Sequence, residues 1–179
     1  VGDNAFKDAI ALRDELCADN YTYFNPRQFS NIHNIHCHFD TTGKEIIKQT
    51  NIISAFIAGS GTGGTLMGVG TALKTKNIKA KIIQVQPEEA NAVHGIQGIN
   101  DGEDFLLDKS IVDETIFIKT KEAIARAKRL AKENGLLVGI SAGANVLAAE
   151  QWVKENNPEH PVVTILCDRG ERYFSCYED

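Results

Sequence analysis

The stretch Phe56-Ile-Ala-Gly-Ser-Gly-Thr-Gly-Gly-Thr65 decides the fold, because an apolar run ends there in a glycine-rich turn. A helix-compatible segment, Leu66 to Lys76, follows directly. Glycines let the backbone turn its N–H groups toward an anion, and the positive end of the helix dipole adds to the attraction. The hydroxyls of Thr62 and Thr65 are further donors. This segment therefore predicts a phosphate-binding loop between a strand and a helix.

Two other interpretations of the loop remain open. Gly59, Gly61 and Gly64 also satisfy the G-x-G-x-x-G pattern of a dinucleotide-binding fold. That fold needs an acidic residue at the end of the next strand, roughly 20 residues on, to bind the ribose hydroxyls. Gln84 or Gln86 holds that position, which disfavours a dinucleotide. The remaining interpretation is a turn that binds no ligand.

Strands and helices alternate along the chain. Hydrophobic spacing predicts strands at 21–24, 52–58, 80–86, 112–118 and 162–166, and helices at 4–18, 41–50, 65–76, 120–134 and 142–156. Thr41 or Thr42 and Thr120 are the predicted N-caps, and Gly135 is the predicted C-terminal stop. The alternation predicts an α/β fold with a parallel sheet and right-handed crossovers. Ligands bind such sheets at the carboxyl ends of the strands, where the glycine loop lies.

Composition excludes some classes of function. The 179 residues include 19 basic and 24 acidic side chains, a formal net charge of −5. There is no basic cluster to attract phosphate backbones, so nucleic acid is not an expected partner. No apolar run approaches the ~20 residues that a membrane span needs, so no membrane contact is expected.

The cysteines and histidines do not indicate a metal site. The four cysteines lack paired C-x-x-C spacing, which predicts reduced thiols rather than a zinc site or a disulfide framework. An H-x-x-H-x-H cluster runs from His33 to His38, in a segment that we expect to be a linker. We therefore expect no bound metal.

Four blocks occur in an order and at spacings that carry a family resemblance. They are Gln28-Phe-Ser-Asn31 with Asn34, His38 and Thr41-Thr-Gly-Lys-Glu-Ile46; Gly61-Thr-Gly-Gly-Thr65; Gly135-Leu-Leu-Val-Gly-Ile-Ser-Ala-Gly-Ala144; and Cys167-Asp-Arg-Gly-Glu-Arg-Tyr173. Together they resemble the cysteine synthase (O-acetylserine sulfhydrylase) family of pyridoxal-phosphate enzymes over nearly the whole chain. The last block and Gln86-Pro-Glu-Glu89 resemble the B-type enzymes, which accept sulfur donors larger than sulfide. The glycine loop resembles the A type.

The resemblance implies a fold and a domain division. The fold is a three-layer α/β sandwich with a mostly parallel sheet, the C-terminal domain of a fold type II pyridoxal-phosphate enzyme. Residues 1–31 would be the tail of an incomplete N-terminal domain, and residues 32–179 the α/β domain that binds the cofactor phosphate. In the family, the lysine that forms the Schiff base lies upstream of the glutamine block. We therefore expect no catalytic lysine in this chain, and no activity from this chain alone.

The resemblance also implies the site residues. Ser141 would contact the pyridine nitrogen of the cofactor, and it could at the same time cap the helix at 142–156. Gln28 would bind the substrate. The residues that would hold the cofactor phosphate are Gly61, Thr62, Gly63, Gly64 and Thr65, and those that would line the pocket are Gly98, Cys167 and Asp168.

The implied activity is the synthesis of cysteine from an activated serine, commonly O-acetylserine, and sulfide or a related sulfur donor by β-elimination and replacement on pyridoxal 5'-phosphate. A neutral hydroxyl at the pyridine nitrogen suits this chemistry better than transamination. The implied partners are a small amino-acid substrate, a second copy in a homodimer of the full-length enzyme, and serine acetyltransferase, and the implied location is cytoplasmic. The alternative is a non-catalytic module that binds phosphate-bearing ligands or a partner chain.

Overall fold

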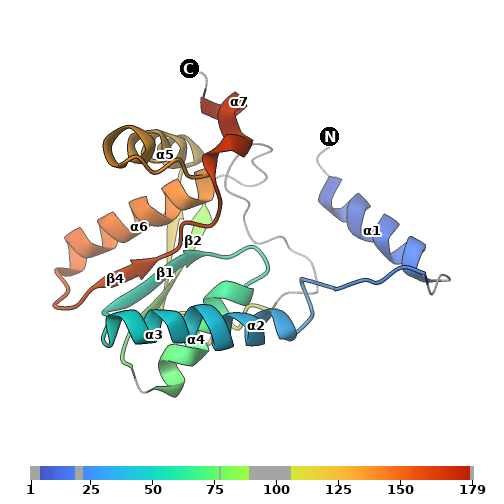
Figure 1. Cartoon of the computed structure of the whole chain (residues 1–179), viewed down its shortest axis with the longest axis horizontal. Helices are drawn as coiled ribbons and strands as arrows, with labels where there is room; N and C mark the ends of the chain where they lie inside the picture. Colours follow the sequence, from blue (N-terminus) through green and yellow to red (C-terminus); the bar gives the residue numbers. More distant parts are fainter. Residues whose placement is uncertain (1–4, 19–21, 77, 89–105, 178–179) are drawn as a thin grey trace.

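Parallel strands form the centre of the molecule. The computed structural model describes residues 5–18, 22–76, 78–88 and 106–177. Within these ranges, four parallel strands form one sheet in the order β3-β2-β1-β4. They are β1 (Ala55–Gly59), β2 (Lys81–Pro87), β3 (Glu114–Ile118) and β4 (Val162–Thr164). Helices cover both faces of this sheet (Figure 1), which confirms the predicted three-layer α/β architecture.

One face of the sheet packs against the helices around the glycine loop. These helices are α2 (His33–His38), the π-helical turn η1 (Phe39–Gly43), α3 (Lys44–Thr50) and α4 (Gly64–Thr75). Phe56 and Ala58 of β1 lie in this cluster with Leu66 of α4. Because α4 begins directly after β1 and its loop, the apolar face of α4 folds back onto the strand that precedes it.

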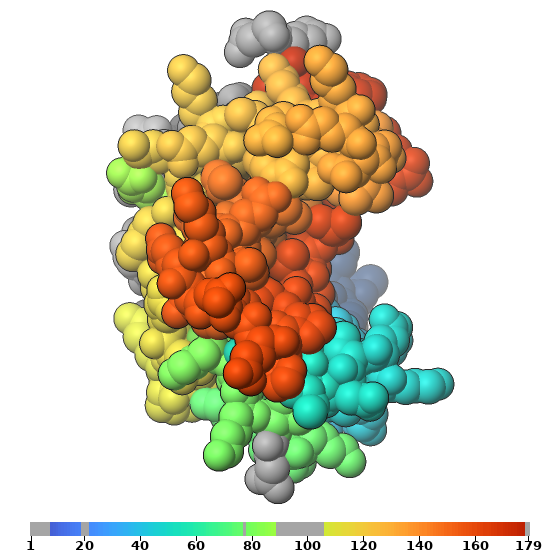
Figure 2. Space-filling model, turned by 90° about the vertical axis from the view of Figure 1, so that its left-hand side faces the viewer, coloured from blue at the N-terminus to red at the C-terminus, as the bar shows by residue number. Residues whose placement is uncertain are grey.

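The other face packs against α5 (Thr120–Asn134) and α6 (Ile140–Asn156). Ala55 and Ile57, which alternate with the residues of the first face, lie here with Ile140 and Ala144. Figure 2 shows α5 and α6 stacked in gold and orange above the cyan helix α3. Burial on both faces explains the apolar sequence of β1, as expected for a central parallel strand.

The helix at 41–50 begins earlier than the sequence predicted. The structure is continuously helical from His33 to Thr50, so the predicted start at Thr41 or Thr42 is wrong and the histidine cluster does not lie in a linker. Asn31 explains the earlier start, because its Oδ1 accepts a hydrogen bond from the His33 amide at 3.0 Å. Thr41 donates instead to the Cys37 carbonyl at 2.7 Å, one helical turn back.

Other boundaries also differ. The predicted strand at 21–24 is wrong over the described residues 22–24, which are irregular. Phe24 is 88% exposed there and pairs with no described strand, and a strand needs a neighbour for its backbone hydrogen bonds. Thr120 is the first residue of α5, whose N-cap is Lys119. Gly135 ends α5 with φ of 68°, which confirms the predicted stop.

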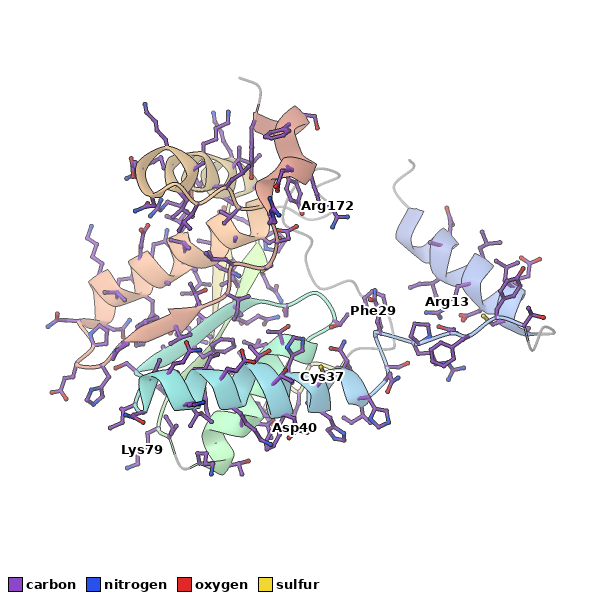
Figure 3. The ribbon with its side chains drawn as sticks, in the orientation of Figure 1. Arg13, Phe29, Cys37, Asp40, Lys79 and Arg172 are labelled. Carbon is purple, nitrogen blue, oxygen red and sulfur yellow. The ribbon has the colours of Figure 1, made fainter. Side chains whose placement is uncertain are left out.

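Helix α1 (Ala5–Ala18) lies apart from the three layers (Figure 1). Phe29 lies between the α/β body and the arm that carries α1 and its Arg13 (Figure 3). At the other end of the chain, the 3₁₀ turn η2 (Gly170–Tyr173) leads into α7 (Phe174–Tyr177). Among the described helices, none combines the length and apolarity needed to cross a membrane.

Candidate functional site

The glycine loop forms the tight turn that the sequence predicted between β1 and α4. Gly63 is the N-cap of α4 and has φ of 88°, in the left-handed region that favours glycine. Its carbonyl accepts the Met67 amide at 2.9 Å, the first bond of the helix. Among the described residues, none accepts a hydrogen bond from the amides of Thr62 or Thr65. In the described part of the chain, the loop therefore presents amide donors without an acceptor at the positive end of a helix dipole.

Thr62 is held in place by a residue from the glutamine block. Its Oγ1 accepts the Gly64 amide and the Asn34 side-chain amide, both at 3.1 Å. The same Asn34 nitrogen donates to the Gln28 carbonyl at 2.9 Å, which ties the Gln28 backbone to the loop. A Cβ at Gly64 would lie 2.1 Å from the Asn34 side chain, so only glycine allows this approach. The sequence analysis quoted Asn34 in a block but did not place it in the site.

Thr65 is held by a different residue. Its Oγ1 lies 3.1 Å from Nε2 of His38, and Nδ1 of His38 lies 3.0 Å from Oγ1 of Thr42. Burial lowers the pKa of His38, which favours the neutral imidazole. In the sequence, His38 is recognisable only as a match to a family block. Its contact with Thr65 could not be predicted, because the two residues are 27 positions apart.

A buried network supports the start of the loop. Gln84 of β2 donates to Oγ of Ser60 at 2.6 Å and accepts from the Thr115 hydroxyl at 3.2 Å. Both Gln84 and Ser60 are buried, at 4% and 5% exposure. A dinucleotide site needs an acid at position 84 or 86. Gln84 does not supply one, and its side chain bonds Ser60 after β1 and Thr115 of β3.

The beginning of α6 forms the second part of the site. Gly139 is the N-cap and Ser141 lies in the first turn, so the prediction that Ser141 caps a helix from Ala142 is wrong. The helix starts earlier because Gly139 donates its amide to the Asp168 carbonyl at 3.0 Å. A Cβ at Gly139 would lie 2.0 Å from Oδ1 of Asp168. The structure thus brings Asp168 to the N-terminus of α6. It contacts Gly139, which precedes Ser141 by two positions.

Asn145 joins the two parts of the site. Its Oδ1 accepts the Gly59 amide at 2.8 Å, and its Nδ2 donates to the Ile165 carbonyl at 2.9 Å and to Sγ of Cys167 at 3.3 Å. Asn145 is only 1% exposed. One side chain therefore links the end of β1, helix α6 and the segment that follows β4. Asn145 was not predicted as a site residue; its one signal in the sequence is a polar side chain in an otherwise apolar stretch of helix.

Cys167 and Asp168 lie side by side at this edge of the sheet. Cys167 is exposed as a whole residue. Desolvation is nevertheless the main cause that raises the pKa of its thiol, and the negative charge of Asp168 raises that pKa further. Oδ2 of Asp168 accepts the Tyr173 hydroxyl at 2.6 Å, while Oδ1 is buried and has no partner among the described residues. Within the described part of the chain, Asp168 therefore keeps one buried oxygen, next to Gly139, without a hydrogen-bond partner.

The bond between Asp168 and Tyr173 predicts a pH dependence. Chiefly this bond, and then desolvation, raises the pKa of Tyr173 from 10.0 to about 12. The contribution of this hydrogen bond to the stability of the folded protein is complete below pH 10 and is lost as the pH rises through about 12. We expect Asp168→Ala to return the Tyr173 pKa toward its ordinary value, measured by ultraviolet absorbance in alkaline titration. Tyr173→Phe identifies the titration step, and an unchanged pKa in Asp168→Ala would contradict the assignment.

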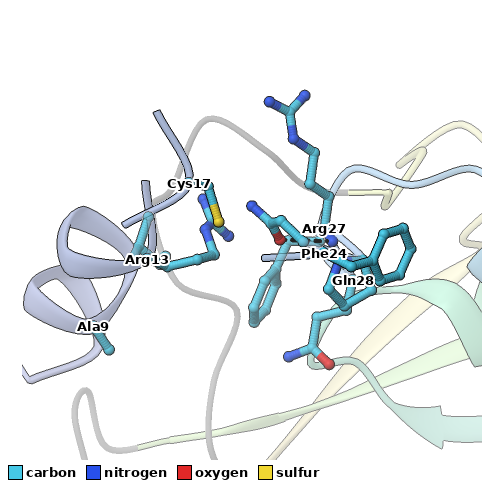
Figure 4. A pocket seen from close by; sticks show the side chains of 10 residues that line it. Ala9, Arg13, Cys17, Phe24, Arg27 and Gln28 are labelled. Carbon is cyan, nitrogen blue, oxygen red and sulfur yellow. Dashed lines mark hydrogen bonds between the residues drawn. The ribbon is translucent and has the colours of Figure 1, made fainter. Parts of the chain in front are cut away.

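Gln28, the residue predicted to bind the substrate, is connected to the glycine loop less directly than Asn34 and His38 are. The Gln28 side chain is exposed and lines a cavity of about 340 Å³ between α1 and residues 24–29. Figure 4 shows Ala9, Arg13 and Cys17 of α1 on one side of this cavity, and Phe24, Arg27 and Gln28 on the other. The backbone of Gln28 is tied to the loop through Asn34, and its side chain has no hydrogen bond to the loop within the described residues. Gly98 lies outside the described residues.

Comparison with known proteins gives a consistent result. The family model for pyridoxal-phosphate dependent enzymes matches residues 1–168. Cysteine synthase of Staphylococcus aureus (strain Mu50 / ATCC 700699) is 40% identical over 186 residues, covering 97% of this chain and 59% of the relative. Cysteine synthase B of Campylobacter jejuni is 40% identical over 180 residues, covering 94% and 59%.

A solved structure agrees with these relatives. O-acetyl serine sulfhydrylase isoform 3 from Entamoeba histolytica has a TM-score of 0.80 at 37% identity, covering 93% of this chain and 53% of that one. The chain spans 59% of the length of the curated relatives it matches. The identity and the structural similarity therefore concern the shared portion, which includes both parts of the site.

Proposed function

Because this chain belongs to the family of pyridoxal-phosphate-dependent enzymes, we propose that it forms the cofactor-phosphate domain of a cysteine synthase. The proposed activity is the synthesis of cysteine from O-acetylserine and sulfide or a related sulfur donor. The observation that carries this proposal is the 40% identity with a cysteine synthase over 97% of the chain.

The glycine loop fits the phosphate of the cofactor. A Cβ at Gly61 would meet nothing within 4 Å, so the mouth of the loop is open. Thr62 accepts two hydrogen bonds from amide groups, which leaves its own O–H proton free to donate outward. Amides at a helix N-terminus and a free hydroxyl form the donor set that a phosphate dianion requires. In this proposal, Gly61, Thr62, Gly63, Gly64 and Thr65 hold the phosphate.

Ser141 has the chemistry for the other end of the cofactor. Bound pyridoxal phosphate supplies an electron-withdrawing ring that makes the α-proton of an amino acid acidic. A neutral hydroxyl at the pyridine nitrogen hydrogen-bonds the ring without holding it protonated, as a carboxylate would. This favours β-elimination and replacement over transamination. Asn145, one turn further along α6, would keep Ser141 in a fixed relation to the glycine loop through its bond to Gly59.

The proposed reaction breaks the bond between the β-carbon of O-acetylserine and its ester oxygen, releases acetate, and forms a carbon–sulfur bond. The α-proton leaves and returns in the course of the reaction. We assign Gln28 to the substrate side, and Cys167 and Asp168 to the pocket wall beside Ser141. The block at Cys167 and Asp168 resembles the B-type enzymes, so a sulfur donor larger than sulfide is part of this proposal.

The organisation of the whole protein is also a proposal. We assign residues 1–31 to an N-terminal domain, which agrees with the position of α1 away from the layers in Figure 1. Residues 32–179 would form the cofactor-phosphate domain. We further propose a homodimer that docks serine acetyltransferase in the cytoplasm, where the four free cysteines would stay reduced.

The test uses the whole protein that carries this chain. After loading with pyridoxal phosphate, it is incubated with O-acetylserine and sulfide, and cysteine is measured by its reaction with acidic ninhydrin. We expect cysteine to form only when all three components are present. Thiosulfate in place of sulfide tests the larger donor; the products are then S-sulfocysteine and acetate, and S-sulfocysteine is measured by mass spectrometry. A folded, cofactor-loaded protein that makes no product with either donor would support the binding module instead.

A further inference from the structure

Three side chains from two helices form a hydrogen-bonded row behind the glycine loop. Thr42 of η1 contacts Nδ1 of His38 at 3.0 Å, and Nε2 of His38 contacts Thr65 of α4 at 3.1 Å. All three side chains are half-buried, and Thr65 alone belongs to the loop that would bind phosphate. The row therefore connects the loop to the helix formed by α2 and η1, to which the proposed function assigns no contact with the cofactor.

Close packing of α2 and η1 on α4 holds this row together. A Cβ at Gly68, on the turn of α4 that follows Thr65, would lie 2.6 Å from Cβ of His38 and from the Ile35 carbonyl. Only glycine leaves room for the ring beside the helix backbone. At the far end, a Cβ at Gly43 would lie 2.6 Å from Cβ of Ala72. The distance from His38 to Thr65 is thus set by backbone contacts on both sides.

The protons in this row have two consistent arrangements. A neutral imidazole has one N–H donor and one acceptor nitrogen, whereas each hydroxyl both donates and accepts. In the first arrangement, Thr42 donates to Nδ1 and the Nε2–H of His38 donates to Thr65. In the second, Nδ1–H donates to Thr42 and Thr65 donates to Nε2. The O–H of Thr65 is free only in the first arrangement.

We propose that His38 is a positioning residue for the phosphate site: its Nε2–H donates to Thr65, so that the Thr65 hydroxyl donates to the bound phosphate group. Binding of the anion selects the tautomer with a proton on Nε2, because the other tautomer uses up the Thr65 proton. This inference rests on the proposed function, since it takes residues 61–65 as the phosphate site.

Thr62 provides the contrast within the same loop. Both of its partners, the Gly64 amide and the Asn34 amide, are fixed donors, so the Thr62 hydroxyl always donates outward. The Thr65 hydroxyl does so only when His38 has the correct tautomer. The two threonines therefore differ in what they require of their neighbours, and this difference can be measured.

The first measurement follows the tautomer directly. The whole protein, with ¹⁵N-labelled imidazoles, is titrated with inorganic phosphate and separately with pyridoxal phosphate, and the His38 signals are assigned from a His38→Gln spectrum. We expect anion binding to move Nδ1 to the shift of an unprotonated nitrogen and Nε2 to that of a protonated one. Anion binding that leaves Nδ1 protonated would overturn the proposal.

The second measurement uses affinity for inorganic phosphate. We expect His38→Leu and Thr65→Val each to weaken binding about 5-fold, the value of one hydrogen bond, and the double variant to be no weaker than either single variant. His38→Gln keeps an N–H donor and should retain most of the affinity. Thr62→Val is the control, because its effect should add to that of His38→Leu.

The outcomes separate the two proposals. Additive effects of His38→Leu and Thr65→Val, in proteins with unchanged circular dichroism, would remove the role of His38 and leave the phosphate site intact. A wild-type protein that binds neither inorganic phosphate nor pyridoxal phosphate would overturn the proposed function, and this inference with it.

Discussion

Gly63→Asp is expected to weaken pyridoxal-phosphate binding by about 100-fold or more, because it adds a negative charge to the loop that would hold the cofactor phosphate. Two like charges about 4 Å apart repel by about 4 kcal/mol at an effective dielectric constant of ~20. The backbone adds to the effect. Gly63 has φ of 88°, and a Cβ there would lie 2.9 Å from the Leu107 amide nitrogen. The measurement is the dissociation constant from absorbance titration of the whole protein.

Gly135→Asp is the matched control for this variant. Gly135 also has a left-handed backbone, with φ of 68°, but a Cβ there would meet nothing within 4 Å. It ends α5 rather than opening α4, so the same substitution adds the same charge and similar backbone strain away from the loop. We expect its cofactor affinity to stay within about twofold of the wild type. Equal affinities of both variants and the wild type would show that the loop is a turn without a ligand.

Asn145→Ala is expected to lower the free energy of unfolding by about 2–4 kcal/mol, because it leaves two partly buried backbone groups without a partner. The Gly59 amide loses its acceptor and the Ile165 carbonyl loses a donor. Cofactor binding should weaken as well, since the end of β1 would no longer be tied to α6. Denaturant unfolding measures the first effect, and absorbance titration measures the second.

Asn156→Ala controls for the loss of an asparagine from the same helix. Among the residues that the structure describes, its side chain donates to the Trp152 carbonyl alone, at 3.0 Å near the exposed end of α6. We expect a change in unfolding free energy of about 0.5 kcal/mol or less and no change in cofactor affinity. If Asn145→Ala were no more destabilising than Asn156→Ala, the bonds of Asn145 would not hold the two parts of the site together.

Elements with a strong local pattern were predicted most accurately. The order of β1, glycine loop and α4 follows from an apolar run, a glycine cluster and helical spacing within neighbouring residues. The stop at Gly135 likewise depends on one residue type and one backbone conformation. The resemblance of four blocks then identified the family, and the match over residues 1–168 confirms it.

The errors arose where a contact outside the local spacing of apolar residues decides the outcome. The start of the helix at His33 depends on Asn31 and on the room that Gly68 leaves for α2, while the spacing of apolar residues alone pointed to Thr41 or Thr42. The residues 22–24 have the composition of a strand but no described strand to pair with. Strand formation requires a partner, and a local pattern does not supply one.

The amino-acid sequence by itself determined the α/β class, the glycine-rich turn at residues 61–65 between β1 and α4, and the family. Each of these depends on residues that are close in sequence or on an ordered set of motifs. Only the tertiary structure decided that Asn34, His38 and Asn145 hold the site together. Their hydrogen bonds cross 28, 27 and 86 positions of the chain. The physical reason is that a polar side chain gains its role from the partner that folding brings within about 3 Å, and local sequence carries no record of that partner.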